Sequence, residues 1–256
     1  MRRLTSLYLG LAILLSSGCS IFQSDEDQGR WSAERYYHEA QSALEIGDYQ
    51  AAINHLEDLE IQYPFSRYTS QGQLEIAYAY YKFNEPESAL AAAERFIKLY
   101  PRHEHVDYAY YLKGLANFER GVSSLDLLLD LETTRRDPKP ALESFRAFEQ
   151  LIKRFPDSDY VADAKQRMVY LRNRLAQHEL YIARYYMRRG APLAAVNRSK
   201  QLLETYPRSP SIPEALALMS EAYLALDLKD LAEDTQKILQ ANYPDYLPAS
   251  RQEIGN

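Results

Sequence analysis

The sequence predicts an all-α protein, a superhelix of about five helix-turn-helix repeats (an α-solenoid). The first observation behind this prediction is an aromatic residue directly before a proline. It recurs as Tyr63-Pro64, Tyr100-Pro101, Phe155-Pro156, Tyr206-Pro207 and Tyr243-Pro244. The intervals between these prolines are 37, 55, 51 and 37 residues. Intervals in the thirties are typical of helix-turn-helix repeats such as the tetratricopeptide (TPR) class.

The second observation is that further positions align when each proline is placed at position 32 of a 34-residue template. Position 8 holds Ala40, Ala77, Ala183 and Ser220, and position 20 holds Ala52, Ala89, Ala195 and Ala232. Position 11 holds Ala43, Tyr80, Tyr186 and Tyr223, and the turn position 15 holds Gly47, Asn84, Gly190 and Asp227. Small residues let two antiparallel helices approach closely, and glycine or asparagine tolerates the left-handed backbone that ends a helix. The third repeat matches only in its second helix, through Phe148, Leu151 and Pro156.

The repeats are expected within a domain at residues 31–256, at about 31–66, 67–104, 105–158, 159–209 and 210–246. The third repeat is long because residues 119–137 form an insertion between helices expected at Asp107–Phe118 and Pro138–Phe155. An insertion of this length is usually functional or disordered. Its leucine run, residues 125–131, is more often a short helix over a core than a partner site. The fourth repeat should open with an unbroken helix from about Val161 to Arg188, which is about 42 Å long.

The N-terminus indicates export and a lipid anchor. Arg2 and Arg3 precede an apolar run, Leu4 to Leu15, that is too short to span a bilayer. Small residues then lead directly into Cys19, the only cysteine of the chain. This arrangement resembles a bacterial lipoprotein cleavage site, although Ser16 stands where leucine is usual. We therefore expect residues 1–18 to be a signal peptide, Cys19 to carry the lipid, and residues 19–30 to be a polar tether.

The charge and the motif content favour a binding protein over an enzyme. Without residues 1–18 the chain keeps 28 basic and 36 acidic residues, a net charge of −8. This balance argues against nucleic acid as a partner, because phosphate binding requires a basic surface. The chain has no nucleophile elbow, no glycine-rich phosphate loop and no metal-ligand helix motif, so no cofactor and no catalytic residue is predicted. His103 and His105 are poorly spaced for a metal on one helix face and more often belong to the turn after Pro101.

Runs of residues outside the generic repeat resemble the BamD family, the TPR lipoproteins of the outer-membrane β-barrel assembly machine. These runs are Tyr63–Tyr68, Tyr78–Lys82, Arg95–Ile97, Asp107-Tyr108 with Gly114-Leu115, Arg136–Pro138, Tyr170–Ala176, and Arg189–Ala191 with Val196–Arg198. The resemblance implies a lipid anchor on the periplasmic side of the outer membrane and a complex with BamA and the accessory lipoproteins BamC and BamE. It also implies that the N-terminal repeats bind the C-terminal targeting segments of unfolded outer-membrane proteins. The C-terminal repeats would then bind the periplasmic domain of BamA.

Two sets of residues are candidates for these contacts. A peptide that ends in an aromatic residue and a free carboxylate requires apolar surface and a nearby cation. A groove for such a peptide is predicted at Tyr63, Phe65, Arg67, Tyr68 and Arg95. The resemblance further implies that Arg198, with its neighbours Asn197 and Arg189, lies in the BamA-docking region. An arginine fork is suited to hold a carboxylate across such an interface.

The 22 tyrosines allow two interpretations. About two thirds of them are expected to belong to the repeat core, and the remainder could line a groove for an extended peptide. Two other functions also remain open. One is a different TPR lipoprotein of the envelope that coordinates cell-wall or division proteins, and the other is a lipid-anchored enzyme that carries repeats. The insertion, the long helix and the family-like runs favour the barrel-assembly scaffold.

Overall fold

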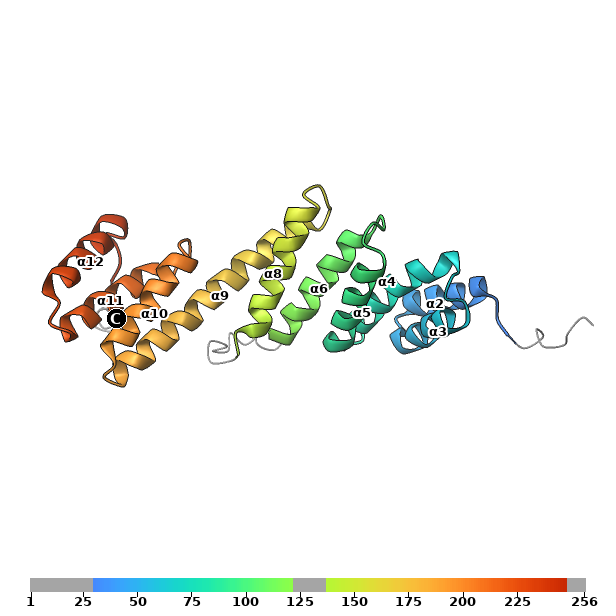
Figure 1. The fold of residues 1–256 in the computed structure, drawn as a ribbon, viewed down its shortest axis with the longest axis horizontal. Coiled ribbons are helices and arrows are strands. Elements are labelled where there is room, and N and C mark those ends of the chain that lie inside the picture. Colours follow the sequence, from blue (N-terminus) through green and yellow to red (C-terminus); the bar gives the residue numbers. More distant parts are fainter. Residues whose placement is uncertain (1–29, 122–136, 248–256) are drawn as a thin grey trace, which may run out of the picture.

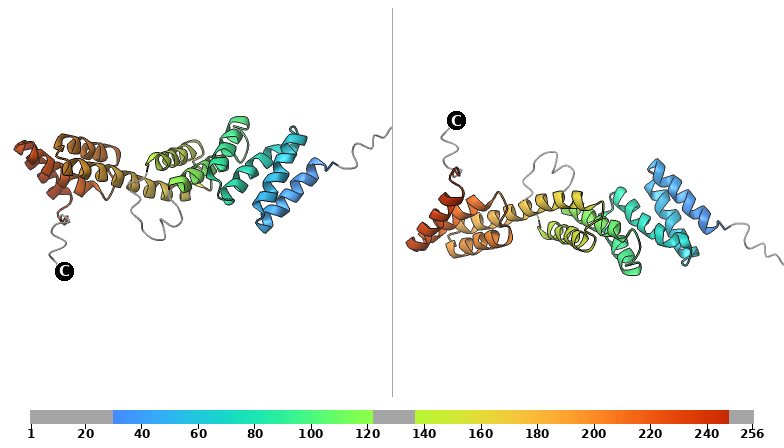
Figure 2. Two further views of the ribbon diagram at one scale, coloured as in Figure 1. Left: turned by 90° about the horizontal axis from the view of Figure 1, so that it is seen from below. Right: turned by 90° about the horizontal axis from the view of Figure 1, so that it is seen from above.

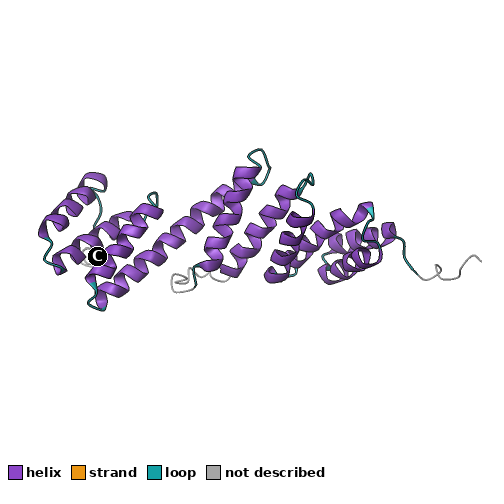
Figure 3. Cartoon of the chain, in the orientation of Figure 1, coloured by secondary structure: helices purple, strands orange, loops and turns teal. Residues whose placement is uncertain are grey.

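The computed structural model describes residues 30–121 and 137–247, which fold into helices connected by short turns, without a strand (Figure 3). The helices are α2 (Ala33–Ile46), α3 (Tyr49–Gln62), α4 (Arg67–Lys82), α5 (Pro86–Leu99), α6 (Val106–Gly121), α8 (Lys139–Arg154), α9 (Val161–Arg188), α10 (Pro192–Thr205), α11 (Ile212–Ala225) and α12 (Lys229–Asn242). The all-α fold class predicted from the sequence is confirmed. The predicted signal peptide, Cys19 and the rest of the tether up to residue 29 lie outside the described residues.

The helices form antiparallel pairs that stack side by side into an elongated array (Figure 1). The pairs are α2/α3, α4/α5, α6/α8, α9/α10 and α11/α12, and each helix also packs against the next one along the chain. Figure 2 shows the same array from below and from above, with the two ends of the described chain far apart. Each pair leaves an apolar stripe on one side, and stacking on the neighbouring pair buries it.

The turn inside four of the pairs depends on one residue with a positive φ angle. Gly47, Asn84, Gly190 and Asp227 have φ angles of 80°, 63°, 69° and 57°. These are the four residues that the template places at position 15. Glycine adopts this left-handed conformation without a steric cost, and asparagine and aspartate tolerate it better than other residues. The chain therefore reverses here and begins the second helix of the pair.

The aromatic–proline pairs form the turns that connect one repeat to the next. Tyr63, Tyr100, Phe155, Tyr206 and Tyr243 are the C-caps of α3, α5, α8, α10 and α12, with φ angles between −126° and −138°. Each aromatic N–H donates to the carbonyl four residues earlier at 2.8–2.9 Å. Each aromatic carbonyl accepts from the N–H three residues later at 3.0–3.1 Å. Proline follows as the second residue of this turn, where its fixed φ angle is favourable.

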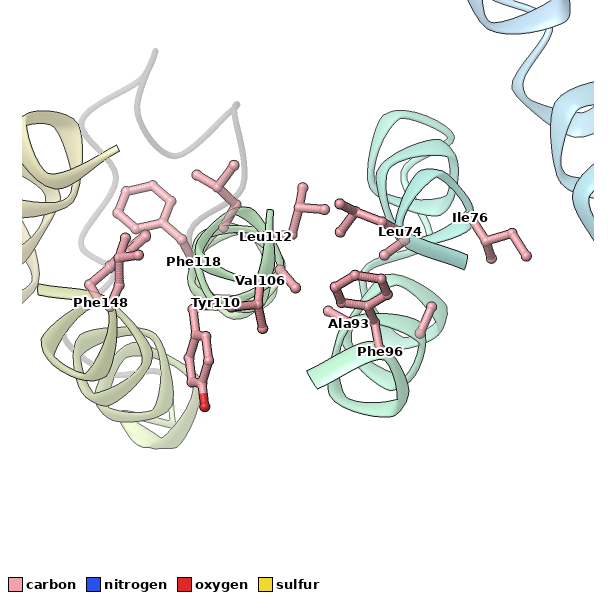
Figure 4. Packing of buried hydrophobic residues seen from close by; sticks show 14 of the residues in the cluster. Leu74, Ile76, Ala93, Phe96, Val106, Tyr110, Leu112, Phe118 and Phe148 are labelled. Atoms are coloured by element: carbon pink, nitrogen blue, oxygen red, sulfur yellow. The ribbon is translucent and has the colours of Figure 1, made fainter. Parts of the chain in front are cut away.

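The small residues of the template lie where the paired helices touch. Ala40, Ala77 and Ala183 on the first helices are fully buried, as are Ala52, Ala89 and Ala195 on the second helices. Large side chains fill the space between neighbouring pairs. Figure 4 shows Val106 and Leu112 of α6 directed toward Leu74 and Phe96 of the preceding pair, with Phe118 and Phe148 packed on the other side of α6.

The third repeat also has small residues where its two paired helices touch. The template matched only the second helix of this repeat, but both helices carry such a residue. Gly114 lies 14 residues after Tyr100, as Ala77 lies 14 residues after Tyr63. On the opposite helix, Ser144 stands where the other repeats have alanine, and its hydroxyl donates to the Gly114 carbonyl at 2.8 Å. A Cβ atom added to Gly114 would overlap the ring of Phe148, which is fully buried. The helices α6 and α8 are therefore in closer contact than an alanine would allow.

The long helix α9 belongs to two hydrophobic cores. It begins at Val161 and ends at Arg188, as the sequence predicts. Leu171 and Leu175 pack into the core formed by α2 to α8. Ala176, the next residue, and Leu180, one turn later, pack into the core shared with α10, α11 and α12. The first half of α9 therefore completes the N-terminal repeats, and its second half begins the C-terminal repeats.

The helix before the insertion is longer than predicted. It continues beyond Phe118 to Gly121, because residues 119–121 still complete helical backbone hydrogen bonds. The rest of the predicted insertion, including the leucine run at residues 125–131, lies outside the described residues.

We expect Gly114→Ala to destabilise the third repeat, because overpacking of a closed core costs roughly 1–3 kcal/mol. Gly72→Ala is the matched control: it gains the same helical propensity, roughly 1 kcal/mol, and its Cβ would meet the Leu56 and Leu59 side chains at 3.2 and 3.3 Å. Urea unfolding followed by circular dichroism should give Gly114→Ala the lower midpoint of the two. Equal midpoints for both variants would contradict the proposed tight contact.

Candidate functional site

A cleft of about 440 Å³ lies along the first helices of the N-terminal repeats. Its walls come from α2, α4 and α6 and from the turns that precede α6 and α9. The lining residues are Gln41, Leu44, Glu45, Gln71, Leu74, Glu75, Tyr78, His105, Tyr108 and Tyr160. A cleft with apolar and aromatic walls and a few converging polar groups is the usual form of a binding site.

One face of α4 supplies the floor of this cleft. Tyr68, Gln71, Glu75 and Tyr78 follow one another at intervals of three, four and three residues, which places them in a stripe along the helix. Small residues on the opposite side of α4, such as Ala77, are buried against α5 and neighbouring helices. The packing of the pair therefore turns the stripe toward the cleft.

The Glu75 carboxylate is the polar centre of the floor. It accepts hydrogen bonds from the Tyr37 hydroxyl at 2.9 Å, from the Gln71 amide at 3.0 Å, and from the Gln41 amide. Burial raises the pKa of the Glu75 carboxyl, and the three donated hydrogen bonds oppose that increase. All three donors are neutral, and no cation forms an ion pair with Glu75 in the described chain.

Tyrosine rings form the opposite wall. Tyr160 stacks on Tyr111 with ring centroids 4.7 Å apart, and it packs on Tyr108 at 5.0 Å. The Tyr111 hydroxyl donates to Asp163 at 2.8 Å, and Arg167 holds the same carboxylate. Burial and the Asp163 charge raise the pKa of Tyr111 to about 12, so the hydroxyl stays protonated and keeps donating. The wall is thereby fixed to the start of α9.

Two of the predicted groove residues continue the cleft toward the start of α4. The Arg67 guanidinium lies over the Tyr68 ring, 4.7 Å from its centre, and also donates to the Tyr68 hydroxyl. Tyr68 in turn stacks on Tyr37 with ring centroids 5.1 Å apart. Because the Tyr37 hydroxyl donates to Glu75, a continuous row of contacts connects Arg67 to the cleft floor.

The other three predicted groove residues have different surroundings. The Tyr63 hydroxyl donates to the carbonyl of Trp31 at 2.8 Å and so holds the residue just before α2. Phe65 is 99% exposed and touches little of the protein. Arg95 forms an ion pair with Glu60 at 2.7 Å, which joins the second helices of the first two repeats. The described contacts therefore do not bring Arg95 together with Arg67 and Tyr68.

The candidate docking residues lie where α9 meets α10. The Arg198 guanidinium on α10 contacts Glu179 of α9 at 3.2 Å and Gln201 at 3.3 Å. Its side chain is 37% exposed, whereas that of Glu179 is 14% exposed. Arg189 caps the end of α9, and both it and Asn197 are exposed. Arg198 thus presents part of its guanidinium to solvent while a carboxylate of the same chain orients it.

Comparison with known proteins identifies the family. Residues 30–239 match the YfiO family, described as an outer membrane lipoprotein. The chain is 43% identical to the outer membrane protein assembly factor BamD of Neisseria gonorrhoeae, over 93% of this chain and 90% of that protein. It is 39% identical to BamD of Vibrio cholerae, over 91% of this chain and 95% of that protein. The chain belongs to the BamD family.

Solved structures that share the architecture are more distant. A complex of the TPR2AB domain of yeast Sti1 matches with a TM-score of 0.46 and 12% identity, over 84% of this chain and 78% of that chain. A TPR protein of Thermus thermophilus matches with a TM-score of 0.37 and 15% identity, over 84% of this chain and 93% of that chain. The BamD relatives are assembly factors, which are scaffolds or adaptors and not enzymes.

Sequence reasoning found part of this site and missed its polar centre. It left an unspecified third of the tyrosines for a possible groove, and Tyr78 and Tyr108 line the cleft. It did not single out Glu75, Gln41 or Tyr160. The stripe on α4 was a usable signal, because a helical face of alternating tyrosine, glutamine and glutamate is unusual for a surface that only contacts water.

Most of the described tyrosines pack against a core, but at its edge rather than in its interior. Tyr110 is the one tyrosine in the described ranges that is buried in a core. Tyr80, Tyr186 and Tyr223, at template position 11, are half-buried and pack against the edges of the cores. Their hydroxyls need water or a partner, so the rings lie at the core boundary. Tyr80 has such a partner, because its hydroxyl donates to Glu57 at 2.7 Å.

Neither a metal centre nor a membrane span is found in the described residues. No group of three or more histidine, cysteine, aspartate or glutamate side chains there could hold a metal ion. His103 lies in the turn after Pro101, where its Nδ1 accepts from the His105 N–H at 3.1 Å and its ring packs on Phe96. None of the described helices combines the length and the apolar character that crossing a bilayer requires.

Proposed function

We propose that this BamD-family protein is a scaffold of the outer-membrane β-barrel assembly complex that binds unfolded outer-membrane proteins and BamA at opposite ends. The N-terminal cleft would bind the targeting segments of the unfolded proteins. The C-terminal repeats would dock the periplasmic domain of BamA. The observation that carries the proposal is the cleft, which joins tyrosine walls to converging hydrogen-bonding groups on one side of the repeat array.

The cleft is suited to an extended peptide. Tyr78, Tyr108 and Tyr160 offer flat apolar surface with few rotatable bonds, so the receptor loses little conformational freedom when it binds. Gln41 and Gln71 each donate one amide hydrogen to Glu75. The second hydrogen of each amide can bond to a peptide backbone carbonyl, and so can the first if the peptide displaces the amide from Glu75. A partly folded barrel strand presents such an unpaired backbone.

The docking part of the proposal rests on Arg198. Its ion pair with Glu179 fixes the guanidinium in one orientation, which lowers the entropic cost of binding a second carboxylate. Asn197, the residue before Arg198, and Arg189, at the end of α9, are both exposed. BamA would contribute the carboxylate, and accessory lipoproteins such as BamC and BamE would belong to the same complex.

Cys19 is proposed as the site of lipid attachment, with the protein on the periplasmic side of the outer membrane. The family description as an outer membrane lipoprotein supports this proposal. Mass spectrometry of the N-terminal peptide would detect the lipid, and an unmodified Cys19 in the membrane fraction would reject it. The alternative of a cell-wall or division coordinator has no comparable support, because the relatives that cover most of the chain are assembly factors.

A targeting peptide should crosslink to the cleft. A photoreactive residue placed at Tyr68 or Tyr108 should form adducts with the C-terminal peptide of an outer-membrane protein, and excess unlabelled peptide should suppress them. The matched control is Tyr185, a 45% exposed tyrosine on the second half of α9. Equal adduct yields at Tyr185 and in the cleft would contradict the proposed binding site.

Arg198→Glu should abolish BamA recovery from detergent-solubilised outer membrane, because the reversed charge repels the partner carboxylate. The control is Glu179→Gln, which breaks the same internal ion pair but keeps the arginine. It should retain most of the BamA, with a modest loss because the guanidinium is no longer held in one orientation. If both variants lose BamA equally, the internal pair and not the docking contact explains the result. Normal recovery of BamA with Arg198→Glu would show that the docking interface does not include Arg198.

A further inference from the structure

We infer that the cleft selects peptides that carry a lysine or arginine, whose charged group binds Glu75 between the faces of Tyr78 and Tyr108. The inference rests on the proposed function of the cleft and assigns the chemistry of its preferred ligand. It also assigns the direction in which the peptide lies.

The first argument is the unbalanced charge of the cleft floor. Glu75 receives hydrogen bonds from Tyr37, Gln41 and Gln71 and has no cation as a partner among the described residues, although it is partly shielded from water. Other carboxylates near these helices, such as Glu60 and Asp163, are paired with arginines of the chain. A carboxylate has room for about four hydrogen bonds, so one position remains for a ligand donor.

The second argument is the composition of the rest of the lining. Glu45 adds a second carboxylate at the exposed rim, one turn of α2 beyond Gln41. Within the described ranges, neither lysine nor arginine lines the cleft, and His105 is its only basic residue. Tyr78, Tyr108 and Tyr160 add aromatic rings to the lining, and aromatic rings attract cations that lie within about 6 Å of their centres. The cleft therefore favours a positive side chain and repels a peptide carboxylate.

The terminal carboxylate of a targeting segment must consequently bind outside the cleft floor. Arg67 is the nearest cation along the row of contacts through Tyr68 and Tyr37, and its guanidinium is exposed. Arg67 and Glu75 are eight residues apart on α4, which corresponds to about 12 Å along the helix axis. An extended peptide rises about 3.3 Å per residue. The basic residue therefore lies about four positions before the carboxylate.

The test compares peptides that differ in one side chain. Fluorescence anisotropy measures binding to the full-length mature protein in detergent. Each peptide ends in an aromatic residue with a free carboxylate and carries either lysine or the uncharged norleucine, placed two to six positions before the end. On the unmodified protein, lysine should tighten binding about three- to ten-fold, as expected for a partly buried ion pair. The gain should be largest near the fourth position and should shrink with added salt.

Glu75→Gln should lower the ratio of lysine-peptide affinity to norleucine-peptide affinity to about one, whatever its effect on the affinity of both peptides. The control is Glu60→Gln, which removes a hydrogen-bonded carboxylate outside the cleft, on the second-helix side, and should leave the preference intact. Equal binding of lysine and norleucine peptides to the unmodified protein would overturn the inference without affecting the proposed function. So would a preference that survives Glu75→Gln. Absence of binding by every peptide would instead overturn the proposed function, and the inference with it.

Discussion

The close contact between paired helices is the constraint on which the rest of this structure depends. Buried alanines lie at the contact in four repeats, and Gly114 with Ser144 takes their place in the third. Because these positions cannot accept bulk, the large side chains of each helix must point to the neighbouring pair or to the edges of the array. Most tyrosines lie at those edges, where their rings are half-buried and their hydroxyls can form hydrogen bonds with water or with polar side chains. The aromatic cleft is therefore a consequence of the same packing rule that stabilises the repeats.

The helix α9 adds a second constraint, because one continuous element belongs to both cores. Leu175 is packed on the N-terminal side and Ala176, the next residue, on the C-terminal side. A helix of this length is stiff, so the two halves keep a fixed relation as long as α9 stays helical. The contacts at its start, from Tyr111 and Arg167 to Asp163, tie it to the cleft wall. Its later turns carry Glu179, which orients Arg198. The candidate peptide site and the candidate docking site are thus attached to the same helix.

The sequence predicted the features that local backbone chemistry controls. The four left-handed turn residues, the aromatic–proline turns and the bounds of α9 all follow from residue types with strong conformational preferences. Gly114 does not fall on template position 8, because Pro156 fixes the template in this repeat and the insertion lies between the two residues. The distance of 14 residues from Tyr100 does place Gly114 at that position. The partners of Arg95 and Arg198 could not be predicted, since Glu60 and Glu179 are brought to them by tertiary packing.

The polar centre of the cleft was hidden for a related reason. In the sequence, Glu75 is one of 36 acidic residues, and solvation is the default expectation for each of them. Glu75 differs from the others because three neutral donors on two helices form hydrogen bonds to it, and no cation is among its described contacts. Those donors compensate for part of the lost hydration, so the carboxylate can remain charged without a ligand. The compensation also limits the affinity that a ligand can gain, because the three donors already replace part of the hydration that the carboxylate has lost. In the proposed function, such a site would discriminate between peptides more than it would retain them.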